Sequence, residues 1–294
     1  MKHAYLIMAH NNFEQLLILL ELLDFPDNVI FIHVDKKSEV PAYISDLVLT
    51  YSPIIFTERI NVYWGDYSQI DCELTLLQAA FDYPLSFSYY HLISGVDLPL
   101  VDQKKFHDFF EINKGKEFVS FIDKKWTEEH RIIKKRIYGY SVFQKYYRSK
   151  IKSMNKIFRL IDKISVELQL LFRINRTKML NEEFMFGPNW FSITNEFTEY
   201  ILGNRGWIEK VFRYTLCGDE IFLQTLMYNS EFYKKNYGEN LRYVDWERGN
   251  PYIFKLNDYE ELENSSKLFA RKFDTTIDCK IIERICESIN ERKD

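Results

Sequence analysis

The chain has 294 residues, of which 46% are hydrophobic, 28% charged and 17% aromatic, and its formal net charge is -4. This composition is typical of a globular chain and excludes collagen-like, low-complexity and intrinsically disordered proteins. The four cysteines lack a C-x-x-C motif and a histidine at metal-ligand spacing, so neither a zinc site nor a disulfide framework is indicated.

Strands and helices alternate in the N-terminal third of the chain. Residues 4–10 predict a buried strand, residues 11–25 a helix capped by Asn11 or Asn12, and residues 28–35 a second strand. This order predicts a βαβ unit, and with it a parallel sheet whose ligand crevice lies at the carboxyl ends of the strands. The pattern continues with a strand at 54–58, a helix at 68–83 and a strand at 89–94.

Beyond residue 115 the pattern is less regular. We expect a strand at 116–123, a strand pair or loop at 184–194, helices at 196–202 and 219–228, a strand and loop at 241–251, and a polar, helix-leaning C-terminus. No internal repeat and no Gly-, Ser- or Pro-rich linker divides the chain, so we expect a single domain over residues 1–294.

Residues 124–178 form a basic segment with 16 Lys or Arg against 4 Asp or Glu, although the chain as a whole is acidic. Within this segment, residues 151–172 have the spacing of an amphipathic helix. The apolar positions of the expected stripe are Ile151, Met154, Phe158, Ile161, Ile164 (or Ser165), Leu168 and Phe172. Such a helix either packs on the core with a solvated charged face or lies on an anionic membrane, and the sequence leaves both open. Nucleic acid is not an expected partner, because no nucleic-acid-binding motif accompanies the charge.

The strand at 28–35 ends at Asp35, which Lys36 and Lys37 follow. An Asp-x-Asp pair after such a strand is typical of sites that hold a divalent cation against a diphosphate, and this strand has none. A diphosphate bound at this edge of the sheet would therefore have to be neutralised by basic side chains.

Eight stretches between residues 5 and 274 carry a resemblance to one family. They are YLIMAHNN, IHVDKKS, YWGDYSQIDCELTLLQAA, HLISGVDLPL, KGKEFV, GPNWFSIT, CGDEIFLQT and LFARKFD. In this order the chain resembles the core-2/I-branching β-1,6-N-acetylglucosaminyltransferase and peptide xylosyltransferase family, glycosyltransferase family 14. The resemblance implies an α/β fold of the GT-A type, in which helices flank a Rossmann-like, mostly parallel central sheet. It also implies a UDP-sugar donor, inversion at the anomeric carbon, and catalysis without a metal or another cofactor.

The resemblance assigns the catalytic base to Glu220 and the diphosphate contacts to Arg248 and Lys272. An inverting transfer needs a base for the acceptor hydroxyl and positive charge for the departing diphosphate, which these residue types can supply. From the residues alone, Asp219 and Glu220 are equally well read as acids in the first turn of a helix. Arg271 is an alternative to Lys272, because one residue of register decides which side chain points inward.

Further site residues follow from the same stretches. For the nucleotide we expect His10, His33, Asp35, Trp64, Gly65 and Asp97, and for the acceptor Trp190, Asp219 and Trp246. Alternatives stay open for several of them: Asp97 is a common turn residue, His33 can be a packed histidine, and either tryptophan can belong to the core. Residues 1–120 would then form a nucleotide-binding half, and residues 121–294 an acceptor and catalytic half.

The implied reaction moves GlcNAc or xylose from a UDP-sugar to a hydroxyl of a glycan, either an oligosaccharide or a lipid-linked acceptor, in surface polysaccharide synthesis. The chain starts with a strand rather than a signal peptide, and it lacks the anchor, stem and disulfide-forming cysteines of animal members. We therefore expect a compact, bacterial-type enzyme in the cytoplasm or peripheral on the cytoplasmic face of the inner membrane. Two alternatives are a glycoside hydrolase, which would need a second carboxylate, and a non-catalytic protein that binds nucleotide or glycan.

Overall fold

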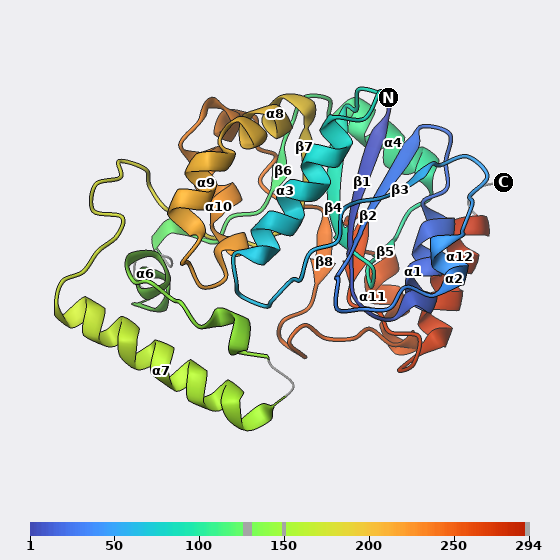
Figure 1. Ribbon diagram of the computed structural model, residues 1–294. Coiled ribbons are helices and arrows are strands. Elements are labelled where there is room, and N and C mark those ends of the chain that lie inside the picture. Colours follow the sequence, from blue (N-terminus) through green and yellow to red (C-terminus); the bar gives the residue numbers. More distant parts are fainter. Residues whose placement is uncertain (126–130, 149–150, 292–294) are drawn as a thin grey trace.

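A computed structural model describes residues 1–125, 131–148 and 151–291. Within the basic segment at 124–178, residues 126–130 and 149–150 lie outside the described residues. The elements that follow are numbered as in Figure 1.

The central sheet has six strands in the order β3-β2-β1-β4-β7-β6 (Figure 1). These strands are β1 (His3–Ala9), β2 (Asn28–Val34), β3 (Ile54–Phe56), β4 (Tyr89–Ser94), β6 (Phe118–Val119) and β7 (Phe191–Thr194). The first four strands are parallel, whereas β7 runs antiparallel to both β4 and β6. The expected α/β class, with a mostly parallel central sheet flanked by helices, is confirmed.

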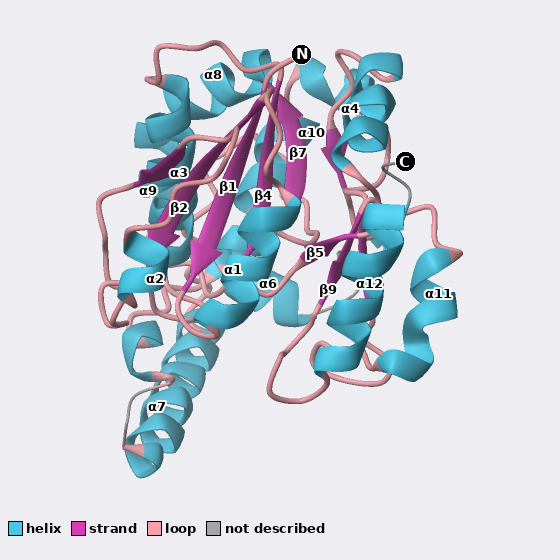
Figure 2. Cartoon of the chain, turned by 90° about the vertical axis from the view of Figure 1, so that its right-hand side faces the viewer, coloured by secondary structure: helices cyan, strands magenta, loops and turns pink. Residues whose placement is uncertain are grey.

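Both faces of this sheet are covered by helices, which is why its central strands are continuous apolar runs. Side chains alternate along β1: Ala4 and Leu6 belong to one hydrophobic core, whereas Tyr5 and Ile7 belong to the other. The first core contains α3 (Ser68–Phe81), α8 (Asn195–Gly203), α9 (Arg205–Phe212) and α10 (Phe222–Tyr228). The second core contains α1 (Phe13–Leu22), α4 (Gln103–Ile112) and α12 (Cys279–Glu291), and Figure 2 shows these helices on its side of the sheet.

A second, three-stranded sheet has the order β5-β9-β8. It consists of β5 (Leu98–Pro99), β8 (Arg242–Val244) and β9 (Phe269–Arg271). The C-terminal region is therefore not only helical as expected, because β9 separates α11 (Tyr259–Glu263) from α12. The strand forms because Phe269 and Ala270 are buried in the second core, a tertiary effect that the polar surroundings of this stretch conceal.

Other elements are shorter than the sequence predicts. The strand expected at 116–123 reduces to β6, and the helix expected at 219–228 divides into a 3-10 turn, η2 (Gly218–Glu220), and α10. The remaining short elements are α2 (Ala42–Ser45), η1 (Gln144–Tyr146), η3 (Glu231–Lys235) and η4 (Leu256–Asp258).

The basic segment forms two helices, α6 (Arg131–Tyr138) and α7 (Lys152–Leu171). Figures 1 and 2 both show α7 projecting from the body of the molecule, beyond the carboxyl ends of β1 and β2. Ion pairing between Lys135 and Glu167 and a hydrogen bond from Tyr147 to Asp162 hold α7 against the neighbouring segments. No helix in the described part of the chain is long and apolar enough to span a membrane.

Candidate functional site

Three loops meet at the carboxyl ends of the central strands. His10 follows β1, Asp35 follows β2, and the turn from Ser94 to Asp97 follows β4. The Asp35 backbone N–H donates to the Ala9 carbonyl at 2.9 Å, which joins the first two loops. The Asp35 carboxylate pairs with the Lys37 ammonium at 3.2 Å, so this lysine is engaged by the aspartate two residues before it.

The two histidines of this edge differ in accessibility. His33 is buried, and its Nε2 accepts a hydrogen bond from the Ile60 N–H at 3.0 Å, so its ring supports the loop after β3 and is not open to a nucleotide. His10 reaches the surface. Burial lowers the pKa of both rings; Asp35 opposes the shift in each, and the Lys272 charge adds to it at His10.

Asp97 is fully buried and serves as an anchor for Arg271. Its carboxylate accepts hydrogen bonds from the Ser94 N–H at 3.0 Å and the Ser94 hydroxyl at 2.6 Å, and it pairs with the Arg271 guanidinium at 2.9 Å. The guanidinium lies 4.4 Å from the centre of the Trp190 ring, a cation–π distance. Trp190 belongs to the first core and is 9% exposed, so it supports Arg271 and is not an open surface for an acceptor.

Lys272 lies beside His10, whose pKa its charge lowers. The loop after β9 is tied to the loop after β1, because the Asn12 side chain donates to Asp274 at 3.2 Å and accepts from the Thr275 hydroxyl at 3.0 Å. Lys272 is half-buried, and no carboxylate of the described residues pairs with its ammonium. A cation held in this way is available to an anionic ligand.

Arg248, the other residue predicted for the diphosphate, is engaged differently. Its guanidinium pairs with Asp245, with Asp258 at 2.7 Å and with Glu261 at 2.8 Å. To contact a ligand it would have to share or release these carboxylates. Trp246, two residues earlier, is 61% exposed and is the predicted acceptor tryptophan that remains open to solvent.

Glu220 lies in the turn η2 and not in the first turn of a helix as the spacing predicts. Cys217, the residue before η2, has a left-handed backbone conformation with φ of 50°. Ile221, between η2 and α10, also departs from helical backbone conformation, with φ of -131°. The Glu220 carboxylate is 36% exposed and pairs with the Arg136 guanidinium of α6 at 2.8 Å. The Glu220 carboxylate is therefore partly exposed to solvent and lies next to a positive charge.

Asp219, the neighbour of Glu220, points into the protein. Its carboxylate is 5% exposed and accepts a hydrogen bond from the Gln69 amide at 2.8 Å. Burial and then the Glu220 charge raise the pKa of Asp219 to about 7. Glu73 of α3 is also buried, and burial together with the Asp219 charge raises its pKa well above the usual range. In this conformation Asp219 is too buried to contact an acceptor, and its side chain supports the turn η2.

The loop with Trp64 and Gly65 packs against the same turn. Gly65 has φ of +74°, and a Cβ atom there would lie 2.9 Å from Leu216 Cδ1, so the space left by the glycine is filled by the protein and not kept for a donor. Its carbonyl accepts from the Cys217 N–H at 2.9 Å. Trp64 is 41% exposed, and the Arg148 guanidinium lies 4.5 Å from the centre of its ring.

The segment Gly187–Trp190 connects the two groups of residues. The Gly187 N–H donates to the Glu220 carbonyl at 3.0 Å, and the Trp190 ring at the other end lies under Arg271. A Cβ at Gly187 would lie 2.2 Å from the Ser120 carbonyl oxygen, so this close approach requires glycine. Three residues of chain span at most ~11 Å, so the Cα atoms of Gly187 and Trp190 lie no farther apart than that.

The family model of the Core-2/I-Branching enzyme matches residues 3–263. The chain belongs to the Core-2/I-Branching enzyme family. It is 23% identical to xylosyltransferase 2 of Canis lupus familiaris over 95% of this chain and 33% of that protein, and 24% identical to xylosyltransferase oxt of Drosophila melanogaster over 88% and 30%. The chain thus spans about a third of the length of the xylosyltransferases it matches.

A shorter relative is the β-1,3-galactosyl-O-glycosyl-glycoprotein β-1,6-N-acetylglucosaminyltransferase of Bos taurus, which is 22% identical over 98% of this chain and 70% of that protein. Among solved structures, the apo form of mouse xyloside xylosyltransferase 1 aligns with a TM-score of 0.40 and 10% identity, covering 92% of this chain and 96% of that one.

In this Core-2/I-Branching family member, sequence reasoning missed four residues that the structure brings to the site. Arg136 lies in the basic segment, outside the eight stretches that carry the resemblance, and only its distance to Glu220 identifies it. Gln69 and Glu73 lie in a matched stretch, where their polar side chains on a buried helix face were the available signal. Arg242 is buried near Asp97: burial lowers its pKa to about 9, the Asp97 charge opposes this shift, and its guanidinium donates to the Ser192 hydroxyl at 2.8 Å.

No three His, Cys, Asp or Glu side chains gather as metal ligands would in the part of the chain that the structure describes. Cys72, Cys217, Cys279 and Cys286 are all free thiols.

Proposed function

We propose that this protein is an inverting glycosyltransferase that moves GlcNAc or xylose from a UDP-sugar to a hydroxyl of a glycan. Membership of the Core-2/I-Branching enzyme family supports the reaction class. The acceptor is an oligosaccharide or a lipid-linked glycan in surface polysaccharide synthesis, at the cytoplasmic face of the membrane. The observation that carries the proposal is the Glu220 carboxylate, half-exposed and paired with Arg136 at 2.8 Å, at one end of a segment whose other end holds Arg271.

Glu220 is the base in this mechanism. The acceptor oxygen forms a bond to the anomeric carbon from the face opposite the diphosphate, and the bond from that carbon to the diphosphate oxygen breaks with its electron pair. The acceptor proton passes to the Glu220 carboxylate. Arg136 orients this carboxylate before the acceptor arrives, because the two groups form an ion pair at 2.8 Å.

Basic side chains stabilise the departing diphosphate in place of a divalent cation. Lys272 contributes a half-buried ammonium that pairs with no carboxylate of the described residues, and Arg271 contributes a guanidinium fixed by Asp97 and Trp190. Arg248 joins them if it exchanges a carboxylate for a phosphate oxygen. Positive charge positioned before the reaction stabilises the transition state without the cost of reorganisation.

The test measures UDP release from purified protein with UDP-GlcNAc and UDP-xylose in turn. Glu220→Gln keeps the shape of the side chain but cannot take a proton, so we expect the rate to fall by ~10²- to 10⁴-fold while UDP affinity stays close to that of wild type. Glu199→Gln, at an exposed position of α8, is the matched control and should keep full activity.

Three results would count against the proposal. A folded Glu220→Gln protein with near-normal turnover would remove Glu220 as the base. UDP binding without UDP release from any UDP-sugar would indicate a binding protein. Release of sugar from a glycan in the absence of a UDP-sugar would indicate a hydrolase.

A further inference from the structure

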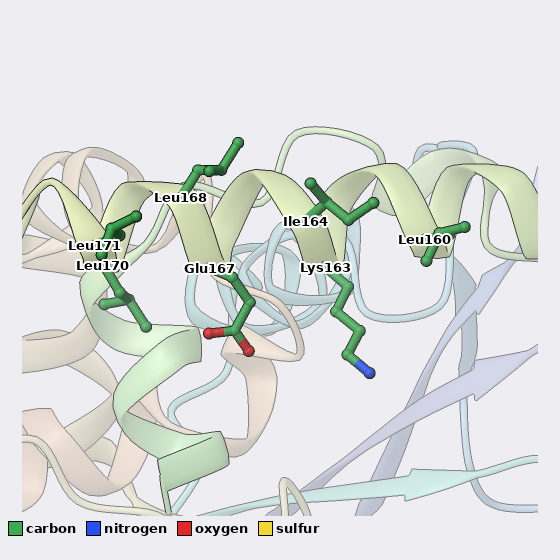
Figure 3. Close-up of a pocket in the computed structure, with 7 residues that line it drawn as sticks. All are labelled: Leu160, Lys163, Ile164, Glu167, Leu168, Leu170 and Leu171. Carbon is green, nitrogen blue, oxygen red and sulfur yellow. The ribbon is translucent and has the colours of Figure 1, made fainter.

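The helix α7 carries an exposed apolar face that no other described element covers. Its residues follow a helical spacing of 3, 4, 7, 11 and 14 positions from the first, so they lie along one side of the helix. They are Ile157, Leu160, Ile161, Ile164, Leu168 and Leu171, with exposed fractions between 42% and 74%. Figure 3 shows part of this face, where Leu160, Ile164 and Leu168 lie along an open groove of about 510 Å³.

This face shares Ile161, Ile164 and Leu168 with the apolar stripe that the sequence predicts, but the other members of the two sets differ. Phe158, a member of the expected stripe, packs against Tyr146 with ring centres 4.5 Å apart, and Met154 is half-buried beside it. Val166 is buried against Gly139, where a Cβ would lie 3.0 Å from its Cγ1. The helix therefore has an inner apolar side that holds it to the body and a separate outer apolar side in solvent.

Charge is distributed unevenly around α7. Both of its carboxylates are engaged: Asp162 is 2% exposed and accepts a hydrogen bond from the Val142 N–H at 3.0 Å, while Glu167, which lies beside Lys163 on the groove (Figure 3), pairs with Lys135. Lys156 and Lys163 flank the outer apolar face and are exposed. The outer side thus combines large aliphatic side chains with the positive charges of Lys156 and Lys163, and the one carboxylate that lines its groove, Glu167, is paired with Lys135.

We infer that the outer face of α7 binds an anionic lipid membrane, with its aliphatic side chains among the acyl chains and its lysines at the lipid phosphates. Helices with this distribution lie in the plane of the membrane interface. A second copy of the chain fits the face less well, because an isologous contact would bring the two sets of lysines together, and the Glu167 carboxylate beside them is already paired with Lys135.

The inferred membrane contact lies at the end of the molecule towards which the carboxyl ends of β1 and β2 point. Both α7 and the carboxyl ends of β1 and β2 lie towards the bottom of Figures 1 and 2. The helix is joined to Glu220 through α6, since Lys135 pairs with Glu167 of α7 while the adjacent Arg136 pairs with Glu220. If the proposed function is right, this contact brings the base to an acceptor carried by a lipid; the membrane contact itself does not depend on it.

Co-sedimentation with vesicles of phosphatidylglycerol and phosphatidylcholine in equal parts tests the inference. We expect binding at low salt that falls steeply as salt rises, and little binding to vesicles of phosphatidylcholine alone. The variant Leu160→Ser/Ile164→Ser/Leu168→Ser should weaken binding by ~tenfold or more. The matched control is Val48→Ser/Ile112→Ser, which alters two side chains that are 88% and 83% exposed elsewhere and should bind as wild type does.

A second pair of variants tests the charge. Lys156→Gln/Lys163→Gln should reduce binding to anionic vesicles, whereas Lys104→Gln/Lys114→Gln, at exposed positions outside the helix, should not. No binding at low salt, or equal binding by the triple serine variant, would overturn the inference. Sedimentation that shows a dimer which the triple serine variant abolishes would assign the face to a second copy and overturn it as well.

The vesicle assay uses no donor sugar, and UDP release can be measured without vesicles. Wild-type protein that releases UDP normally but does not bind vesicles would therefore reject the membrane contact alone. Vesicle binding without UDP release would reject the proposed reaction alone.

Discussion

Asp219 offers a test of how the candidate site is built, because the burial of its carboxyl group makes the free energy of unfolding depend on pH. Its pKa is raised from 3.8 to about 7, first by burial and then by the Glu220 charge. The folded protein therefore holds this proton at a pH where the unfolded chain has released it. Stability falls as pH rises from about 4 to about 7, and it stays at the lower value above that window. At 1.36 kcal/mol for each tenfold change in proton affinity, the difference is roughly 4 kcal/mol.

The variant Asp219→Asn removes the ionisation and keeps an oxygen to accept the hydrogen bond from Gln69, which is 2.8 Å away. We expect this variant to be more stable than wild type at about pH 8, with a free energy of unfolding up to roughly 4 kcal/mol higher. The difference should vanish near pH 4. The variant should also lower the pKa of Glu73, because the Asp219 charge that raises it is removed.

Urea unfolding followed by circular dichroism at a series of pH values measures the effect. Asp108→Asn, at an exposed position of α4, is the control and should leave the pH dependence unchanged. If Asp219→Asn is destabilised by the same amount at every pH, Asp219 is an ordinary ionised structural residue and the reasoning fails. A stabilised variant that transfers sugar more slowly would identify a carboxyl group retained for function at the expense of stability.

Two further predictions concern ligand binding and packing. Lys272→Ala should weaken UDP binding by ~10- to 100-fold, the effect of losing a charge-assisted hydrogen bond, whereas Arg248→Ala should weaken it less because three carboxylates already engage that guanidinium. Titration calorimetry with and without EDTA decides this: a larger loss for Arg248→Ala, or an EDTA-induced loss restored by Mn²⁺, would contradict it. Gly187→Ala should lower the melting temperature, since its Cβ would lie 2.2 Å from the Ser120 carbonyl oxygen, whereas Gly206→Ala, with no atom within 4 Å, should not. Equal melting temperatures would refute the close approach.

The strands that could be predicted from sequence are those buried on both faces. The runs that form β1, β2 and β4 are long, apolar and bounded by turn residues, so a local pattern specifies them. The N-terminal cap of α1 could also be predicted from local sequence, because the Asn12 side chain accepts a hydrogen bond from the Gln15 N–H, three residues later. The strands β5 and β9 have two and three residues and depend on partners far along the chain, which no local pattern records.

The candidate site was predictable as a set of loops but not as a set of contacts. Resemblance to a family marked His33, Asp97 and Trp190, yet it could not tell a residue that contacts a ligand from one that supports such a residue. All three are buried, and the last two hold Arg271. The pair of Arg136 and Glu220 joins positions 84 residues apart, and only the packing of α6 on the body brings them together.

Under the proposed function, basic side chains neutralise a diphosphate at a site where an Asp-x-Asp pair is missing. Lys37, Arg136, Arg248 and Arg271 each pair with at least one carboxylate, which fixes their positions but also reduces the charge that they offer to a ligand. Lys272 pairs with no carboxylate of the described residues, and partial burial makes its unbalanced charge more effective than it would be in water. A diphosphate that arrives next to Lys272 gains this charge without breaking an existing pair. Its second partner is then Arg271, whose guanidinium Asp97 and Trp190 hold in place. Affinity for UDP should consequently depend more on the lysine than on either arginine.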